Sequence, residues 1–425
     1  MASPMIVFML VVLLDSISVS LLASHLNNQE QTLGFDDVQI GIVGAVFTGC
    51  QILASPIIGS LADVKGRKTI LLFCLFICSV SYFSLGITTS FIAYVAFRAI
   101  IGSFQQVQML TKALAPDYIE DMDQVAALYG RSLSVTTFGL AFGPGVSKRI
   151  TEAYPDVSFV ILCAILATLF MFKRDLIRFL PENGDQKRRT AEAASISETY
   201  SISTLDTCQQ TVKKLYSIKW SNYWDILLFK FLMTLAMGQY YSNFNTFLDN
   251  NLTIEPSDLG YILNFQRIVS SICNNTVVYL FKLYKNDKDY SQRMLHVFIL
   301  MTLSLLGLAS ATSVPAYMAL IVPKALSFSL AKIISLQVLV HRSPANYRGT
   351  LLGMAHSVDI ASDLLSPLVF GYISPFFGDC SAFYVAALIA SVGIIVSYQF
   401  APQKTQLKAE PNKKKEIKKN KKKNK

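Results

Sequence analysis

Charged residues are scarce in this chain of 425 residues: they make up 16% of it, whereas 52% is hydrophobic. Soluble domains are about 25% charged, and a soluble protein with so little charge would expose large apolar patches and aggregate. The hydrophobic residues gather in blocks of roughly 20, the length that an α-helix needs to cross about 30 Å of hydrocarbon. The composition therefore excludes a soluble protein and predicts an all-α integral membrane protein with many spans.

Signals of metal, redox, nucleotide and catalytic sites are also missing. The seven cysteines include no CxxC pair, and the four histidines are too scattered to build a metal site. No Gly-x-x-x-x-Gly-Lys-Ser/Thr loop is present, so we expect no direct use of ATP. No His, Cys or nucleophile–base constellation predicts an enzyme. We therefore expect no cofactor, no bound metal and no catalysis.

The net charge of +10 arises at the C-terminal end of the chain. Residues 401–425 hold 11 lysines and two glutamates, and the remainder is nearly neutral. A basic tail gives no reason to expect a nucleic-acid partner. Two interpretations of the tail stay open. It is a disordered segment drawn to anionic lipids, or its dilysine at Lys422 and Lys423 is an endoplasmic-reticulum retrieval signal.

Twelve hydrophobic segments are predicted to span the membrane, six on each side of a polar gap at 174–223. The expected organisation is an N-terminal six-helix bundle (1–173), a cytoplasmic linker (174–223), a C-terminal six-helix bundle (224–400) and a disordered lysine-rich cytoplasmic tail (401–425). A common spacing from Gly130 to Pro144 and from Gly353 to Pro367 suggests that the two halves are related repeats. The predicted spans are 5–26, 40–60, 69–88, 91–113, 126–147, 157–173, 224–247, 257–281, 294–312, 315–339, 350–373 and 379–400.

Lysine and arginine placement predicts the orientation of the spans. The connections on one side carry many basic residues, whereas those on the other side hold only Lys148 and Arg149. Basic residues accumulate on the cytoplasmic side, so both termini are expected in the cytoplasm. The Asn-Leu-Thr sequon at Asn251 then falls on the outer side, where it is either glycosylated or a chance match. The membrane compartment stays undetermined.

The connection between the second and third spans carries the strongest local motif, Gly-Ser-Leu-Ala-Asp-Val-Lys-Gly-Arg-Lys. It resembles the signature loop of the major facilitator superfamily, and the resemblance implies twelve transmembrane helices in two pseudo-symmetric six-helix bundles. A tight turn between two helices favours glycine, and a carboxylate and a guanidinium at helix ends can hold one conformer. The resemblance assigns a cytoplasmic gate to Gly59, Asp63, Gly66, Arg67 and Lys68.

Further matches resemble the drug/proton antiporter branch of the same superfamily. They are an acidic residue in the first span, an Arg-x-x-x-Gly motif in the fourth and a Gly-x-x-x-Gly-Pro motif in the fifth. In the fifth span the family pattern continues with paired glycines, and Ser147 and Lys148 stand there instead, which puts antiport in doubt. A helix-bending role is still expected. The matching residues are Asp15, Arg98, Gly102, Gly139, Gly143 and Pro144.

Charged residues within the spans predict the working parts of the protein. Each costs roughly 2.5–3.5 kcal/mol at the bilayer centre, so each needs a partner or a task. Proton or substrate coupling is expected of Asp15, Arg98, Asp359 and Asp363. The last two lie on one helix face, where they form a structural lock with Lys324 or Lys332 or act as protonatable carboxylates. Lys230 and Lys332 lie near the cytoplasmic side and could snorkel to it.

A substrate cavity is expected beside the seventh span, which is unusually polar for a membrane helix. Its aromatic and amide side chains either contact substrate or anchor the helix at the membrane interface. An excess of basic over acidic charge would favour an organic anion, provided that Lys230 and Lys332 face the cavity. The predicted cavity residues are Gln239, Tyr240, Asn243, Arg267 and Lys324.

These features predict a secondary transporter that moves a small organic solute by alternating access, with protons as a candidate coupling ion. The expected partners are that solute and membrane lipids, and the expected state is a monomer. The alternative is a membrane sensor or scaffold that retains the fold without transport. The erosion of the second signature loop favours the alternative, and the buried ionisable groups oppose it.

Overall fold

The computed structural model describes residues 4–23, 26–119, 122–154, 157–178, 216, 218–252, 256–280, 291–344, 346–378 and 381–398. Nearly all of them are helical. The predicted linker therefore lies largely outside the described residues, as do the tail, the dilysine and the side chain of Asn251. Seven of the described helices are long and apolar enough to cross a membrane. Large apolar side chains such as Leu53, Ile92 and Leu388 stay exposed on them, as expected of surfaces that face lipid.

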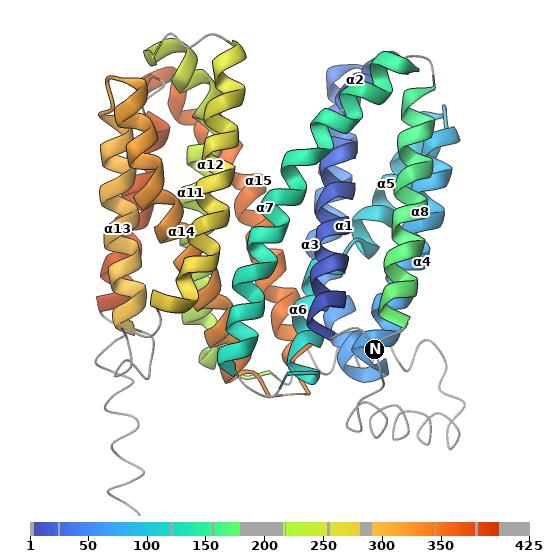
Figure 1. Ribbon diagram of the computed structural model, residues 1–425, viewed down its shortest axis with the longest axis horizontal. Helices are drawn as coiled ribbons and strands as arrows, with labels where there is room; N and C mark the ends of the chain where they lie inside the picture. The colour runs from blue at the N-terminus through green and yellow to red at the C-terminus, as the bar shows by residue number, and fades with distance from the viewer. Residues whose placement is uncertain are drawn as a thin grey trace, which may run out of the picture.

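The described helices form two groups (Figure 1), one before and one after residues 179–215 in the sequence. The N-terminal half contains α1 (Pro4–Ala23), α2 (Leu26–Thr32), α3 (Asp37–Lys65), α4 (Arg67–Ile87), α5 (Phe91–Phe104), α6 (Val107–Leu114), the 3₁₀ turn η1 (Ala115–Asp117), α7 (Met122–Ala153) and α8 (Ser158–Arg178). The C-terminal half contains η2 (Trp220–Asn222), α11 (Trp224–Leu252), α12 (Pro256–Leu280), α13 (Ser291–Ala309), α14 (Val314–Arg342), α15 (Arg348–Phe377) and the helix Ser381–Tyr398.

The predicted fourth span, 91–113, is broken into two helices, which corrects the expectation of one continuous helix. α5 ends at Phe104 and α6 begins at Val107. The two glutamines between them make side-chain hydrogen bonds to neighbouring helices. Tyr82 Oη donates to Gln105 Oε1 at 2.9 Å, and Ser55 Oγ donates to Gln106 Oε1 at 3.0 Å. Partners in α4 and α3 thus donate to the two amide oxygens at the break, which an apolar site would leave unsatisfied.

The two halves meet along α3 with α15 and α7 with α12 (Figure 1). At the end of the molecule where α3 finishes, a Cβ at Gly59 would fall on the carbonyl oxygen of Gly349, and a Cβ at Gly353 on that of Ser55. Glycine is therefore required where α3 and α15 cross. We call this end the gate end and the opposite end, which carries α2, the α2 end.

α7 runs from Met122 to Ala153 through the predicted bending motif. A Cβ at Gly139 would lie 2.7 Å from Cβ of Ser16 on α1. Ser20 Oγ of α1 donates to the Leu140 carbonyl at 2.8 Å. Gly139 thus lets α7 pack closely on α1. The packing around Gly143 and Pro144 is not described, and bending at this motif stays a prediction.

Candidate functional site: a polar gate and a charged centre

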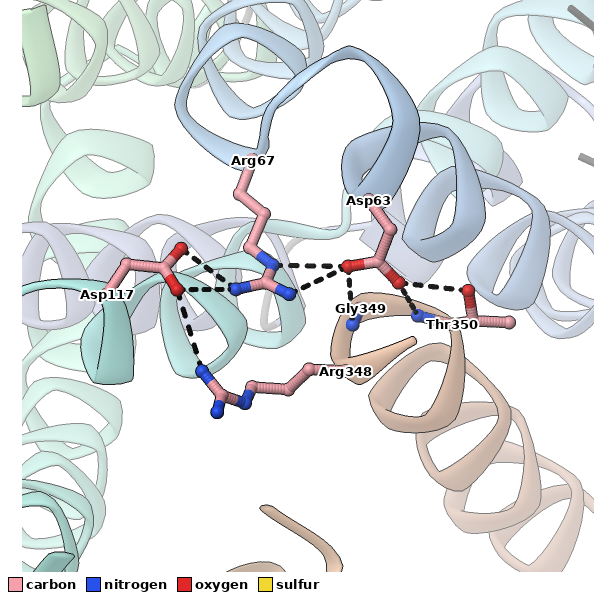
Figure 2. A network of polar contacts seen from close by, with 6 residues as sticks. All are labelled: Asp63, Arg67, Asp117, Arg348, Gly349 and Thr350. Atoms are coloured by element: carbon pink, nitrogen blue, oxygen red, sulfur yellow. Dashed lines mark hydrogen bonds and ion pairs between the residues drawn. The ribbon is translucent and has the colours of Figure 1, made fainter. Parts of the chain in front are cut away.

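The gate is built where α3 turns into α4. Gly66 joins the two helices with φ of 96°, a conformation that other residues rarely adopt. This turn places Asp63 against the first turn of α15 (Figure 2). Its Oδ1 accepts the backbone N–H of Gly349 at 2.9 Å, and its Oδ2 accepts the backbone N–H and the hydroxyl of Thr350 at 2.8 and 3.0 Å. A carboxylate of one half therefore caps a helix N-terminus of the other, where negative charge is stabilised.

Arg67 extends this contact into a chain of alternating charges (Figure 2). Its Nη2 lies 2.8 Å from Asp63 Oδ1, and its Nη1 lies 2.6 Å from Asp117 Oδ1. Arg348 Nη1 in turn lies 3.5 Å from Asp117 Oδ1 and forms an ion pair with it. Asp63 and Asp117 belong to the N-terminal half and Arg348 to α15, so the charge chain contacts the C-terminal half at both ends. Opening the gate end must separate both contacts.

The structure places the predicted gate residues on one side of this contact, and their role as a gate stays a prediction. The expected residues Gly59, Asp63, Gly66 and Arg67 lie at the crossing, and Lys68 is buried at the start of α4. Sequence reasoning assigned no gate role to Asp117, Arg348 or Thr350. Arg348 carried a usable signal, since it is a basic residue immediately before a predicted span.

Asp15 of α1 is paired with a lysine that sequence reasoning missed. Lys173 Nζ of α8 lies 3.1 Å from Asp15 Oδ1, and the side chains are 0% and 4% exposed. The same ammonium lies 3.4 Å from the centre of the Phe170 ring. Lys173 stands at the last position of the predicted span 157–173, which hid it at a boundary. A buried pair of this kind is costly to break on one side only.

Asp359 of α15 forms an ion pair with Lys230 of α11 rather than with Lys324 or Lys332. Lys230 Nζ lies 2.6 Å from Asp359 Oδ2, and Thr234 Oγ1 donates to Oδ1 at 3.1 Å. Lys332 of α14 lies over the Phe328 ring at 4.2 Å and interacts electrostatically with Asp359 and Asp363. Within the described residues, Asp363 has no basic group in ion-pair distance. Lys230 is therefore directed toward α15, and Lys332 lies against Phe328 near the same two carboxylates.

Lys112 of α6 brings the N-terminal half into the same cluster. It interacts electrostatically with Lys230, Lys332 and Asp359 across the boundary between the halves. It also lines a pocket together with Phe8, Gln108, Tyr129, Ser132 and Thr136. We call Lys112, Lys230, Lys332, Asp359 and Asp363 the central cluster. It contains three ammonium groups against two carboxylates.

The predicted cavity residues of α11 are packed inside the C-terminal half. Lys324 of α14 is 1% exposed, and its ammonium lies 4.0 Å from the Tyr240 ring and 5.2 Å from the Tyr241 ring. Tyr240 Oη donates to Gln266 Oε1 at 2.8 Å. Within the described part of the chain, no carboxylate lies within ion-pair distance of Lys324. Gln239 and Asn243 are fully buried, and Arg267 is partly exposed.

Arg98 of α5 is 6% exposed and lies over the Phe47 ring at 4.2 Å. Its Nε has no hydrogen-bond partner among the described residues. Gly102, one turn later, packs against the backbone of Phe47. The two motif residues therefore hold α5 against α3, and the buried guanidinium forms no ion pair with any described residue.

Two helical halves joined by a polar contact at one end, with ionisable groups at the centre, define a membrane protein of the alternating-access class. The chain belongs to the Major Facilitator Superfamily, which residues 5–280 match. This confirms the resemblance and the twelve-helix, two-bundle fold predicted from the sequence.

Individual proteins support the same assignment. The chain is 22% identical over 350 residues to solute carrier family 22 member 18 of Mus musculus, covering 82% of this chain and 84% of that protein. It is 23% identical over 257 residues to the quinolone resistance protein NorA of Staphylococcus aureus, covering 60% and 59%. The crystal structure of the human organic anion transporter MFSD10 superposes with a TM-score of 0.71 at 15% identity, covering 93% of this chain and 100% of that one.

Proposed function

We propose that this transporter carries a small organic anion through the central cluster by alternating access. Lysines from both halves contribute to that cluster, so a solute bound there contacts the parts that move relative to each other. Asp359 neutralises one of the three ammonium groups through its ion pair with Lys230. Lys112 has no ion pair among the described residues, and this single observation carries the proposal, because a cation at low dielectric attracts a carboxylate or phosphate.

The similarity to MFSD10 supports the anionic substrate, since that protein is named as an organic anion transporter. The positive-inside rule places the gate end at the cytoplasm. The described conformation is then closed toward the cytoplasm.

Proton coupling is proposed at Asp363, four residues beyond Asp359 on α15. Ionised, Asp363 offsets part of the lysine charge that the anion needs. A proton on Asp363 leaves that charge available, so a proton and an anion bind together and cross together. Asp15 is less suited to this task, because its carboxylate is held by Lys173.

The test is uptake into proteoliposomes of a panel of radiolabelled organic anions and cations, with and without a proton gradient. Lys112→Gln should lower anion uptake by about 10- to 100-fold, the equivalent of about 1.5–3 kcal/mol for a charge-assisted contact. Lys148→Gln is the matched control, because Lys148 is 77% exposed at the α2 end. Asp363→Asn should retain exchange and lose gradient-driven accumulation.

Three outcomes would contradict the proposal. Uptake of cations in preference to anions would exclude the anionic substrate. Equal effects of Lys112→Gln and Lys148→Gln would remove the central cluster from the pathway. An absence of flux for every compound, from folded protein, would favour the sensor or scaffold.

A further inference from the structure

Glu30 is a buried carboxylate that no part of the proposed transport path uses. It lies on α2, in the connection between α1 and α3, and its side chain is 2% exposed. Sequence reasoning passed over it because it falls in a polar segment between two spans. The structure folds that segment back onto α5 instead of leaving it in water.

Aromatic packing holds this connection in place. Phe35 makes edge contacts with Phe91 and Tyr94 of α5 at centroid distances of 5.2 and 5.5 Å. The Phe35 N–H donates to the Glu30 carbonyl at 3.1 Å. Tyr94 Oη donates to Glu30 Oε1 at 3.2 Å. Glu30 is therefore fixed over α5 by contacts on both its backbone and its side chain.

The partners of Glu30 differ from those of the other buried acids in the described part of the chain. Asp15 has Lys173 at 3.1 Å, and Asp225 has Arg342 at 2.9 Å. Glu30 has the neutral hydroxyl of Tyr94, and no cation of the described residues lies within 4.0 Å of its carboxylate. Burial disfavours the charged form of a carboxylate that has no ion pair, so such a group binds a proton more readily.

Among the described residues, the charged and titratable groups that face Glu30 are Tyr94 and Arg98, both of α5. Burial raises the pKa of the Glu30 carboxyl, while the positive charge of Arg98 and the hydrogen bond from Tyr94 act in the opposite direction. Arg98 forms no ion pair with the part of the chain that the structure describes, so the ionisation of Glu30 changes the net charge that surrounds a buried guanidinium. Glu30, near the α2 end, is thus coupled electrostatically to Arg98 within the bundle.

We propose that Glu30 is a proton-binding site that sets the transport rate according to the pH at the α2 end. Ionised, Glu30 offsets the charge of Arg98. Protonated, it leaves that charge free, and an anion approaching from the α2 end meets a more positive potential. Only the sign of this rate effect rests on the proposed anionic substrate. The proton site itself does not.

The first test measures initial rates of anion uptake while the pH at the α2 end is lowered from about 7.5 to about 5. The wild-type rate should rise about fivefold, because protonation of Glu30 removes one negative charge from the surroundings of Arg98. Glu30→Gln keeps an acceptor for Tyr94 and cannot ionise, so its rate should stay at the acid-side value at every pH. Tyr94→Phe removes a hydrogen bond that favours the carboxylate, so its profile should move to higher pH.

The matched control is Glu152→Gln, since Glu152 is 64% exposed at the same end and should keep the wild-type profile. A Glu30→Gln protein with the wild-type profile would overturn the proposal. A wild-type rate that does not respond to this pH would overturn it as well.

The second test needs no substrate and therefore separates this inference from the proposed function. A carboxyl whose pKa is raised by folding contributes stability below its ordinary pKa, near 4.5, and that contribution is lost as the pH rises through the folded value. The melting temperature of wild type should match that of Glu30→Gln at low pH and fall below it as the pH rises. A constant difference would exclude Glu30 as the titrating group, even if anion transport were established.

Discussion

Neutralising Asp63 should shift the protein away from the conformation closed at the gate end. Asp63 accepts two backbone N–H groups and one hydroxyl from α15, and its side chain is fully buried. Asp63→Asn keeps the size of the side chain but replaces one acceptor oxygen with a donor group. That donor faces the N–H and hydroxyl of Thr350, which are donors too, and the remaining contact with Gly349 loses its charge.

The magnitude follows from the contacts that cross between the halves. A hydrogen bond to a charged group contributes about 1.5–3 kcal/mol. Losing the equivalent of two such bonds at the lower value costs the closed conformation about 3 kcal/mol. Since about 1.4 kcal/mol corresponds to a factor of ten, the ratio of closed to open molecules should fall about 100-fold. Arg67 retains Asp117, so the α3–α4 turn should stay folded.

Distances between spin labels can measure this shift directly. Thr69 of α4 and His341 of α14 are exposed at the gate end of the two halves, and cysteines at these positions accept labels in a background free of native cysteines. Asp63→Asn should add a population at longer distance. Asp36→Asn is the control, because Asp36 caps the other end of the same helix and contacts only that helix. An unchanged distance distribution in Asp63→Asn would refute the reasoning.

Two further predictions concern packing and the buried ion pair. Gly59→Ala places a methyl group on the Gly349 carbonyl, so transport should fall about 5- to 150-fold, for an overpacking cost of about 1–3 kcal/mol. Gly41→Ala on the same helix meets nothing within 4 Å and should transport normally, and equal uptake by the two variants would contradict the close crossing. Asp15→Asn leaves the ammonium of Lys173 buried and unpaired, so thermal unfolding should show a loss of about 3–5 kcal/mol. Adding Lys173→Met should recover part of the lost stability. Asp175→Asn, at an exposed position of α8, is the control and should have no effect. If the double variant recovered no stability, Asp15 would have another role.

Features of the structure that depend on a short stretch of sequence could be predicted from the sequence. Segment length and hydropathy indicated the spans, and the Gly66 turn was readable because a positive φ favours glycine. Asp63 and Arg67 were predicted as gate residues because the loop that contains them resembles the signature loop of the family, and their gate role stays a prediction. The pairing of Asp359 with Lys230 was not predicted, since the two residues lie 129 positions apart in the sequence and several lysines could reach the same face.

Residues at segment boundaries were the hardest to interpret. Lys173 at the end of a predicted span and Arg348 before another gave no sign of their partners. Glu30 was passed over in the connection between two predicted spans, because a short polar segment carries no periodicity that reveals burial. In each case the residue type was visible, and its environment was not.

The sequence alone determined that this chain enters a membrane, that its helices divide into two sets of six, and that ionisable groups lie among them. These follow from the free energy of transferring each segment out of water, which depends on composition and length. Only the tertiary structure decided which charges neutralise each other. Asp15 pairs with Lys173 and Asp359 with Lys230, whereas Glu30 has no ion pair among the described residues. Coulombic interaction depends on the distance between side chains and on the surrounding dielectric, and both are set by how the helices pack.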